Sequence, residues 1–251
     1  MERLIKLYGE RNTNTNYMSR LIGLNLDARE LRGTVPKWMR YLFGTERQRD
    51  LYFEFTYGNN LGWKHSCVKP PDALLKYRLV REKRVAFVSI TKNPYSWLLS
   101  LHRNHYHQEY REPPSFEEFL TLPWKTVGRE ECGAVVANPV ELWNLKNASY
   151  LHLRELGGLN ITTESLFEDA EAVIAKIGKH FGIGRRQEAF VNYEVSTKNR
   201  DVGPEYYRDY YLNERWAEKL SNESLEIINR TLDRRLVAHF GYELRETASP
   251  Q

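Results

Sequence analysis

Apolar and polar positions along the chain alternate between short apolar runs and longer segments with helical spacing. Residues 3–8 form an apolar run, residues 9–14 are polar, and Met18 and Leu21 then begin a set of apolar positions with near-helical spacing. The pattern predicts a strand over residues 3–8, a polar loop, and a helix over residues 15–26.

Two later segments repeat this order. Residues 84–91 form a β-branched run that is apolar on both faces, as in a buried parallel strand. Pro94 suits the first turn of a helix, which we expect over residues 95–102. A third strand is expected over residues 159–163, followed by a helix from residue 164 to about residue 181. Strands that alternate with helices predict an α/β fold with a mostly parallel sheet.

The C-terminal part has a charged, amphipathic helix pattern from residue 214 to residue 240. We expect it to split near Ser221 and to end at Gly241, a suitable C-cap. The chain contains no internal repeat, low-complexity tract or Gly/Ser-rich linker, so residues 1–251 are expected to form a single domain.

Composition narrows the class of protein. With 41% hydrophobic and 28% charged residues, the 251-residue chain is globular rather than disordered or collagen-like. The formal net charge of +4 suits an anionic ligand but is too small to indicate nucleic acid.

Compartment is predicted from what the chain lacks. No window reaches 18 apolar residues, so no membrane span is expected, and residues 1–8 are too short an apolar run for a signal peptide. Cys67 and Cys132 are too few for a disulfide framework. We therefore expect a cytoplasmic location and interpret the four Asn-X-Ser/Thr sequences as chance matches.

The polar loop after the first predicted strand is suited to an anion. Backbone N–H groups at the start of a helix point toward such a ligand, and the helix dipole favours negative charge there. Thr13, Thr15 and Asn16 add side-chain donors, and Arg11 adds a planar charge. The G-x-x-x-x-G-K-[ST] pattern of nucleotide-triphosphate loops is absent. An ordinary polar turn with an Asn/Thr cap is the alternative interpretation.

A second cation lies at the end of the next predicted strand. Lys92 follows that strand, and Ser100 comes two helical turns later, so the two side chains can hold one anionic group between them. Ligands of parallel sheets bind outside the carboxyl ends of the strands. Two such turns at one edge predict a ligand with two separated anionic groups.

These segments, in this order, resemble the sulfotransferase family, whose donor is 3′-phosphoadenosine 5′-phosphosulfate. Residues 9–17 resemble its 5′-phosphosulfate loop, and residues 85–100 resemble its 3′-phosphate motif. Residues 62–66, Gly-Trp-Lys-His-Ser, resemble the strand-end segment that supplies the catalytic base. Residues 161–166 and 240–244 resemble two further family segments, so the resemblance spans nearly the whole chain.

The resemblance implies a three-layer, P-loop-like α/β sandwich. It also implies transfer of a sulfuryl group from this donor, without a metal, to an acceptor hydroxyl, for which a glycan is one option. The donor-binding residues would be Arg11, Asn12, Thr13, Asn14, Thr15 and Asn16 at the 5′ end, Lys92 and Ser100 at the 3′-phosphate, and Lys198 in a covering segment. The catalytic residues would be His65 as the base, with Arg11 and Lys64 stabilising charge.

The sequence departs from the family pattern at three positions. Asn14 stands where the family usually has Gly, and Asn tolerates left-handed backbone better than most residues. Asn12 occupies the place of the usual loop Lys, next to Arg11. Lys92 replaces the commoner Arg, which keeps the charge but loses the planar fork.

Other polar and aromatic clusters have several interpretations. His102, His105 and His107 fit an ordinary polar helix end, the lining of an acceptor pocket, or a metal site. Glu109 is a second choice of base. A run of four tyrosines has helical spacing that favours core packing: Tyr206, Tyr207, Tyr210 and Tyr211.

Two other functions compete with sulfuryl transfer. A P-loop kinase lacks support because no Gly-Lys-Ser/Thr occurs. A non-catalytic nucleotide- or RNA-binding protein is suggested only by the basic balance, and we expect no nucleic-acid partner. The sequence identifies neither the acceptor nor the oligomeric state.

Overall fold

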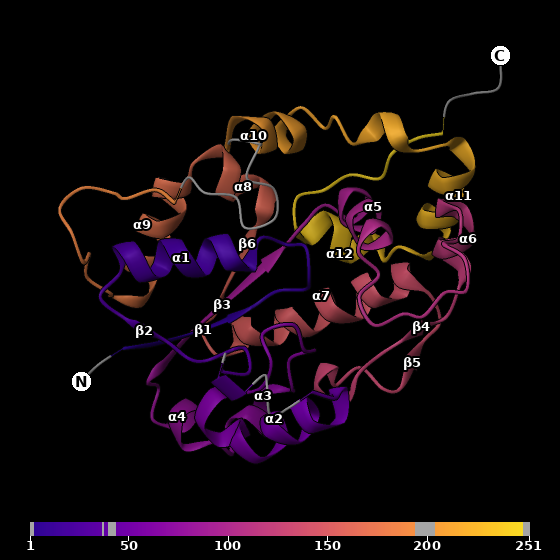
Figure 1. Cartoon of the computed structure of the whole chain (residues 1–251). Helices are drawn as coiled ribbons and strands as arrows, with labels where there is room; N and C mark the ends of the chain where they lie inside the picture. The colour runs from indigo at the N-terminus through magenta and orange to yellow at the C-terminus, as the bar shows by residue number, and fades with distance from the viewer. Residues whose placement is uncertain (1–2, 37, 40–43, 194–203, 248–251) are drawn as a thin grey trace.

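The computed structural model describes residues 3–36, 38–39, 44–193 and 204–247 (Figure 1). The strands are β1 (Leu4–Tyr8), β2 (Arg29–Glu30), β3 (Val85–Thr91), β4 (Trp124–Lys125), β5 (Val135–Val136) and β6 (Leu159–Thr162). The longer helices are α1 (Thr15–Asn25), α2 (Glu46–Asn60), α5 (Pro94–Arg103), α7 (Pro139–Glu155), α9 (Ala170–Phe181), α10 (Pro204–Leu212) and α11 (Asn222–Thr231). The shorter ones are α3 (Pro71–Leu74), α4 (Arg78–Arg81), α6 (Phe116–Thr121), α8 (Thr163–Glu168), α12 (Arg234–His239) and the 3₁₀ turns η2 (Gly128–Glu130) and η3 (Ala217–Lys219).

Within these residues the central sheet has four parallel strands in the order β2-β1-β3-β6. β1 pairs with β3 in the register Leu4–Val85, and β3 pairs with β6 in the register Val88–Leu159. The predicted α/β class and parallel sheet are confirmed. Because the strands are parallel, their carboxyl ends meet at one edge, where the loops after β1 and β3 lie.

Helices cover both faces of this sheet, an arrangement compatible with a three-layer sandwich (Figure 1). Ile5 and Leu7 of β1 pack in a core with α1 and α9, whereas Leu4 and Tyr8 pack with α2, α3 and α7. This division follows the period-two alternation of a strand that is buried on both faces.

A third core lies beyond the carboxyl edge, where α5, α6, α7 and α10–α12 meet. Trp97, Trp124, Trp143 and Trp216 are all buried there. Tyr210 and Tyr211 join this core, as their spacing predicted, whereas Tyr206 is 55% exposed.

Side-chain caps divide two segments that the apolar pattern joins. The helix expected from residue 164 to residue 181 is two helices, because Asp169 has extended backbone and its carboxylate accepts from the N–H of Ala172. In the C-terminal part, Ser221 caps α11 at the predicted split, and Asp233 starts α12 as a second break.

A buried lysine brings the end of α2 to the sheet. Lys6, in the middle of β1, donates from Nζ to the carbonyls of Asn60, at 2.7 Å, and of Gly62. Burial lowers the pKa of Lys6 to about 7. This contact fixes the start of the segment that carries Lys64 and His65.

The two cysteines form a disulfide, Cys67–Cys132, between positions 65 residues apart. The expectation drawn from their small number, that they build no disulfide framework, misses this single cross-link. Sequence counts do not show that two distant loops meet, as the segments after α2 and after η2 do here. No described helix is long and apolar enough to cross a membrane.

Candidate anion-binding and transfer site

The loop between β1 and α1 is tightly wound. Asn12 and Asn14 have positive φ, 67° and 62°, which asparagine tolerates. The hydroxyl of Thr13 donates to the carbonyl of Glu10 at 2.6 Å and closes the turn. Gly9 is required at the start, since a Cβ there would lie 2.6 Å from Cγ2 of Ile90. The departure at Asn14 from the family pattern is therefore compatible with a closed loop.

This loop leaves the N-terminus of α1 without a side-chain cap. Asn14 makes no capping hydrogen bond, although α2, α5, α7, α9, α11 and α12 each begin with one. The N–H groups of Thr15 and Asn16 have no acceptor among the described residues, and Nδ2 of Asn14 is buried without a partner. Unpaired donors at the positive end of a helix dipole form a site for an anion.

At the second predicted anion site, Lys92 and Ser100 contact each other directly. Nζ of Lys92 donates to Oγ of Ser100 at 2.9 Å and to the hydroxyl of Tyr211 at 3.2 Å. Lys92 is fully buried, and burial lowers its pKa to about 7 against the opposing effect of Glu164. A charged ligand beside this ammonium would satisfy a cation that now has only neutral partners within hydrogen-bond reach.

Tyr211 lies beside both sites and was not identified from the sequence as more than a core residue. Its hydroxyl accepts from Lys92, and the side chain of Asn14 is near enough to oppose the effect of burial on the pKa of Tyr211. Burial raises the pKa of Tyr211 to about 12. Tyr211 is 119 residues from Lys92, so no local spacing could reveal the contact.

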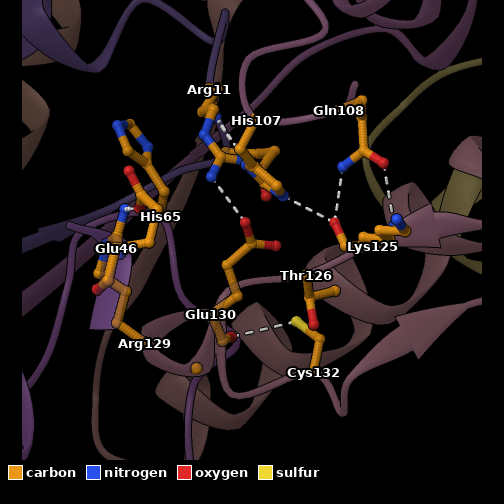
Figure 2. Close-up of polar contacts among 12 residues, drawn as sticks. Arg11, Glu46, His65, His107, Gln108, Lys125, Thr126, Arg129, Glu130 and Cys132 are labelled. Carbon is orange, nitrogen blue, oxygen red and sulfur yellow. Dashed lines mark hydrogen bonds and ion pairs between the residues drawn. The ribbon is translucent and has the colours of Figure 1, made fainter. Parts of the chain in front are cut away.

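Arg11 is held rigidly rather than projecting from the loop. Its guanidinium lies between the rings of Trp63 and Tyr106, 4.7 and 4.8 Å from the centroids. Nη2 donates to Oε1 of Glu130 at 2.6 Å (Figure 2). Nη1 is buried, has no hydrogen-bond partner in the described structure, and lies 3.7 Å from Oε1 of Glu10.

Asn12, at the place of the usual family lysine, joins the loop to the end of α5. Its Nδ2 donates to the carbonyl of Ser100 at 3.3 Å, and its Oδ1 accepts from the hydroxyl of Tyr106 at 2.8 Å. Asn12 therefore links the β1–α1 loop to the helix that carries Ser100.

The Lys64–His65 segment does not follow a strand, which corrects the sequence expectation. It is a turn, held because Lys64 N–H donates to the carbonyl of Gly33 and the carbonyl of Lys64 accepts from Gly9 N–H, at 3.0 and 2.9 Å. Nζ of Lys64 donates to Oδ1 of Asn16 at 2.6 Å. The ammonium thus lies at the uncapped start of α1.

His65 is oriented by the same loop. Its Nδ1 lies 2.5 Å from the carbonyl oxygen of Gly9. A carbonyl only accepts, so Nδ1 carries the proton and Nε2 keeps a lone pair. Burial and the cations Lys64 and Arg11 hold the pKa of His65 well below 6.5. The imidazole is therefore neutral at physiological pH, as a base must be.

Three buried charged residues beneath Arg11 were missed by the sequence analysis. Nζ of Lys146 lies 2.8 Å from Oε2 of Glu10 and 3.5 Å from Oε2 of Glu130, and it donates to the carbonyl of His65. Glu130 and Lys146 come from separate segments, η2 and α7, and nothing in their local sequence signals this meeting.

The three histidines after α5 point to separate acceptors. His102 contacts the carbonyl of Pro114 at 2.9 Å, and His107 contacts that of Lys125 at 2.7 Å (Figure 2). His105 lies 3.5 Å from the carbonyl of His102. Among the described residues, no cluster of three His, Cys, Asp or Glu side chains is arranged for a metal.

Two further sequence candidates are Glu109 and Lys198. Glu109 is exposed, and Lys198 lies outside the described residues. No protein-family model matches the chain, and no curated protein matches it at a significant level.

Proposed function

We propose that this protein is a sulfotransferase that moves a sulfuryl group from 3′-phosphoadenosine 5′-phosphosulfate to an acceptor hydroxyl. One observation carries the proposal. Two groups of hydrogen-bond donors suited to anions, the uncapped start of α1 and the Lys92–Ser100 pair, lie at one sheet edge, and Tyr211 bonds Lys92 between them. A nucleotide with separate 5′ and 3′ anionic groups matches two such sites.

Hydrogen-bond donors without a partner support binding of this nucleotide. Nη1 of Arg11, Nδ2 of Asn14 and the first N–H groups of α1 would hold the 5′-phosphosulfate. Lys92 and Ser100 would hold the 3′-phosphate. A role for Lys198 in covering the nucleotide stays a prediction.

The donor, when bound, supplies an activated sulfuryl group and a bisphosphate leaving group. Nε2 of His65 is free to take the proton of the acceptor hydroxyl, because Nδ1 is committed to the carbonyl of Gly9. Lys64, at the start of α1, stabilises negative charge that develops on the 5′ side. Arg11, clamped between two rings, presents a fixed cation to the same side.

The alternatives fit these residues less well. A P-loop kinase would place a Lys and a Ser/Thr at the end of a G-x-x-x-x-G loop, and this loop has neither in that pattern.

The expected cytoplasmic location is opposed by the Cys67–Cys132 disulfide, since disulfides persist mainly in oxidising compartments. The acceptor remains open among glycans, phenols and small metabolites.

The test is transfer of radiolabelled sulfate from the donor to a panel of glycan, phenolic and small-metabolite hydroxyls. Wild-type protein and the control His239→Ala, at an exposed histidine of α12, should label the same acceptor, whereas His65→Ala should not. Labelling from ATP with magnesium instead would support the kinase. Tight nucleotide binding without transfer to any acceptor would support a non-catalytic protein.

A further inference from the structure

Four charged side chains, two acidic and two basic, are buried together at the proposed transfer site. Glu10, Arg11, Glu130 and Lys146 are at most 5% exposed. Although burial opposes it, Lys146 and Arg11 hold the pKa of Glu130 below its ordinary value, so Glu130 is charged. Buried ion pairs add little stability relative to apolar packing, because desolvation offsets the attraction. We therefore ask which side chains these charges hold in position.

Glu130 contacts both halves of the proposed catalytic machinery. Its Oε1 accepts from Nη2 of Arg11 at 2.6 Å, and its Oε2 lies 3.5 Å from Nζ of Lys146, which donates to the carbonyl of His65. One carboxylate thus fixes the guanidinium directly and the histidine segment through Lys146. Figure 2 shows Glu130 between Arg11 above and Cys132 below.

The disulfide holds Glu130 against the histidine segment. Cys132 follows Glu130 by two residues, and Cys67 follows His65 by two residues. The N–H of Cys67 also donates to the carbonyl of Glu130 at 2.7 Å. Glu130 ends the short turn η2, whose other end is tied to α2 because Asp50 accepts from the N–H groups of Gly128 and Arg129.

We propose that Glu130 is a positioning residue of the transfer site, held in place by the Cys67–Cys132 disulfide. The inference rests on the proposed function. Glu130 makes no described contact with Lys92 or Ser100, so it aligns the 5′ cation and the base without holding the 3′-phosphate. Its loss should lower the rate of transfer while leaving affinity for the 3′-phosphate nearly unchanged.

Glu130→Gln tests this, with Glu131→Gln as the matched control. Glu131 is the next carboxylate in the chain, but it pairs with Lys69 at 3.5 Å and not with Arg11. Glu130→Gln should reduce the single-turnover rate at saturating donor by about 10²-fold, the scale of a small misalignment. Affinity for adenosine 3′-phosphate, which lacks the 5′ group that Arg11 faces, should change less than about threefold, a difference below 1 kcal/mol. Equal rates in Glu130→Gln and wild type, with both folded, would overturn the proposal.

A second readout does not depend on transfer. Phenylglyoxal modifies accessible arginines, and peptide mass spectrometry locates the product. Arg11 should be protected in wild type and labelled in Glu130→Gln, whereas Arg129, bonded to Asp50 and Glu46, should stay protected in both. Unchanged protection of Arg11 would show that Glu130 does not hold it.

Wild-type protein supplies the same test if Glu130→Gln fails to fold. Dithiothreitol gives two electrons and two protons to the disulfide, which yields two thiols as the reagent forms its own cyclic disulfide. Reduced protein should label at Arg11 and, if active, transfer more slowly; continued protection would contradict the proposal. Absence of transfer by wild type would instead refute the proposed function, and the labelling would still report on Glu130.

Discussion

Among single residues, Lys92 has a charge that depends strongly on pH. Burial lowers its pKa from 10.5 to about 7, so much of it is neutral in the free protein above that pH. A phosphate beside Nζ favours the charged form. Binding of adenosine 3′,5′-bisphosphate at about pH 8.5 is therefore expected to take up about one proton. Calorimetry in buffers of different ionisation enthalpy measures this uptake.

Lys92→Met keeps the buried stem and removes the charge. It should abolish the proton uptake and weaken binding of the bisphosphate by about 1.5–3 kcal/mol, the range for a charged hydrogen bond. Binding of adenosine 5′-phosphate, which lacks the 3′ group, should be weakened much less by the same substitution. Lys76→Met, at an exposed lysine, is the control. Equal losses for both nucleotides would remove Lys92 from the 3′-phosphate site.

His65 gives a second prediction at this scale. His65→Ala should lower transfer by about 10²–10⁴-fold, the range for positioned acid–base catalysis, with little change in donor affinity. The wild-type rate should stay level as pH falls to 6.5 and decline only at lower pH. The reason is that the imidazole becomes protonated only near its depressed pKa. A pH–rate profile that falls with a midpoint above 6.5 would place the base elsewhere.

The contact between Lys92 and Ser100 was predictable because local spacing joins the two residues. Lys92 and Ser100 lie eight positions apart on one β–α unit, and they touch. Glu130 lies 119 positions from Arg11, and only the tertiary fold brings the two into contact. Sequence spacing cannot predict such a contact, which is why the buried charges were missed.

At the scale of elements, the β1–loop–α1 unit depends on one small residue. Gly9→Ala would place a Cβ 2.7 Å from the backbone oxygen of Ile90 and from Cγ2 of Thr15. We expect a loss of about 1–3 kcal/mol in the free energy of unfolding, as in other overpacked sites, together with weaker nucleotide binding. Urea denaturation and calorimetry measure the two effects.

Gly23 provides the matched control within the same β1–loop–α1 unit. A Cβ at Gly23 meets nothing within 4 Å, so Gly23→Ala should stabilise the protein by about 0.5–1 kcal/mol and leave binding unchanged. If Gly9→Ala behaved like Gly23→Ala, the close approach at the loop would not constrain the site.

The three strand–helix units were predictable because each begins with a short apolar or β-branched run and continues with helical spacing. β2 has only two residues and leaves no periodic signal. The Lys64 segment was expected at a strand end because residues 62–66 resemble a strand-end segment, whereas the structure has a turn there that bonds Gly33 and Gly9 without belonging to the sheet. Whether such a segment forms a turn or a strand depends on its tertiary contacts, which the sequence pattern does not show.

At the scale of the whole molecule, the disulfide joins segments that secondary structure does not. Cys67 and Cys132 are 65 residues apart, and a cross-link over a loop of this length contributes about 2–4 kcal/mol to the free energy of unfolding. Urea denaturation should show a free energy of unfolding that is lower by this amount when reductant is present. The double variant Cys67→Ser/Cys132→Ser should be insensitive to reductant; sensitivity there would show that the reagent acts at another place.

The central claim is that one sheet edge binds two separated anionic groups of a single nucleotide. Calorimetric titration with adenosine 3′,5′-bisphosphate, compared with ATP plus magnesium, tests it most directly. We predict saturable one-to-one binding of the bisphosphate that is at least about tenfold tighter than that of ATP, a difference of about 1.4 kcal/mol. Equal or tighter binding of ATP, or no binding of the bisphosphate, would contradict the claim.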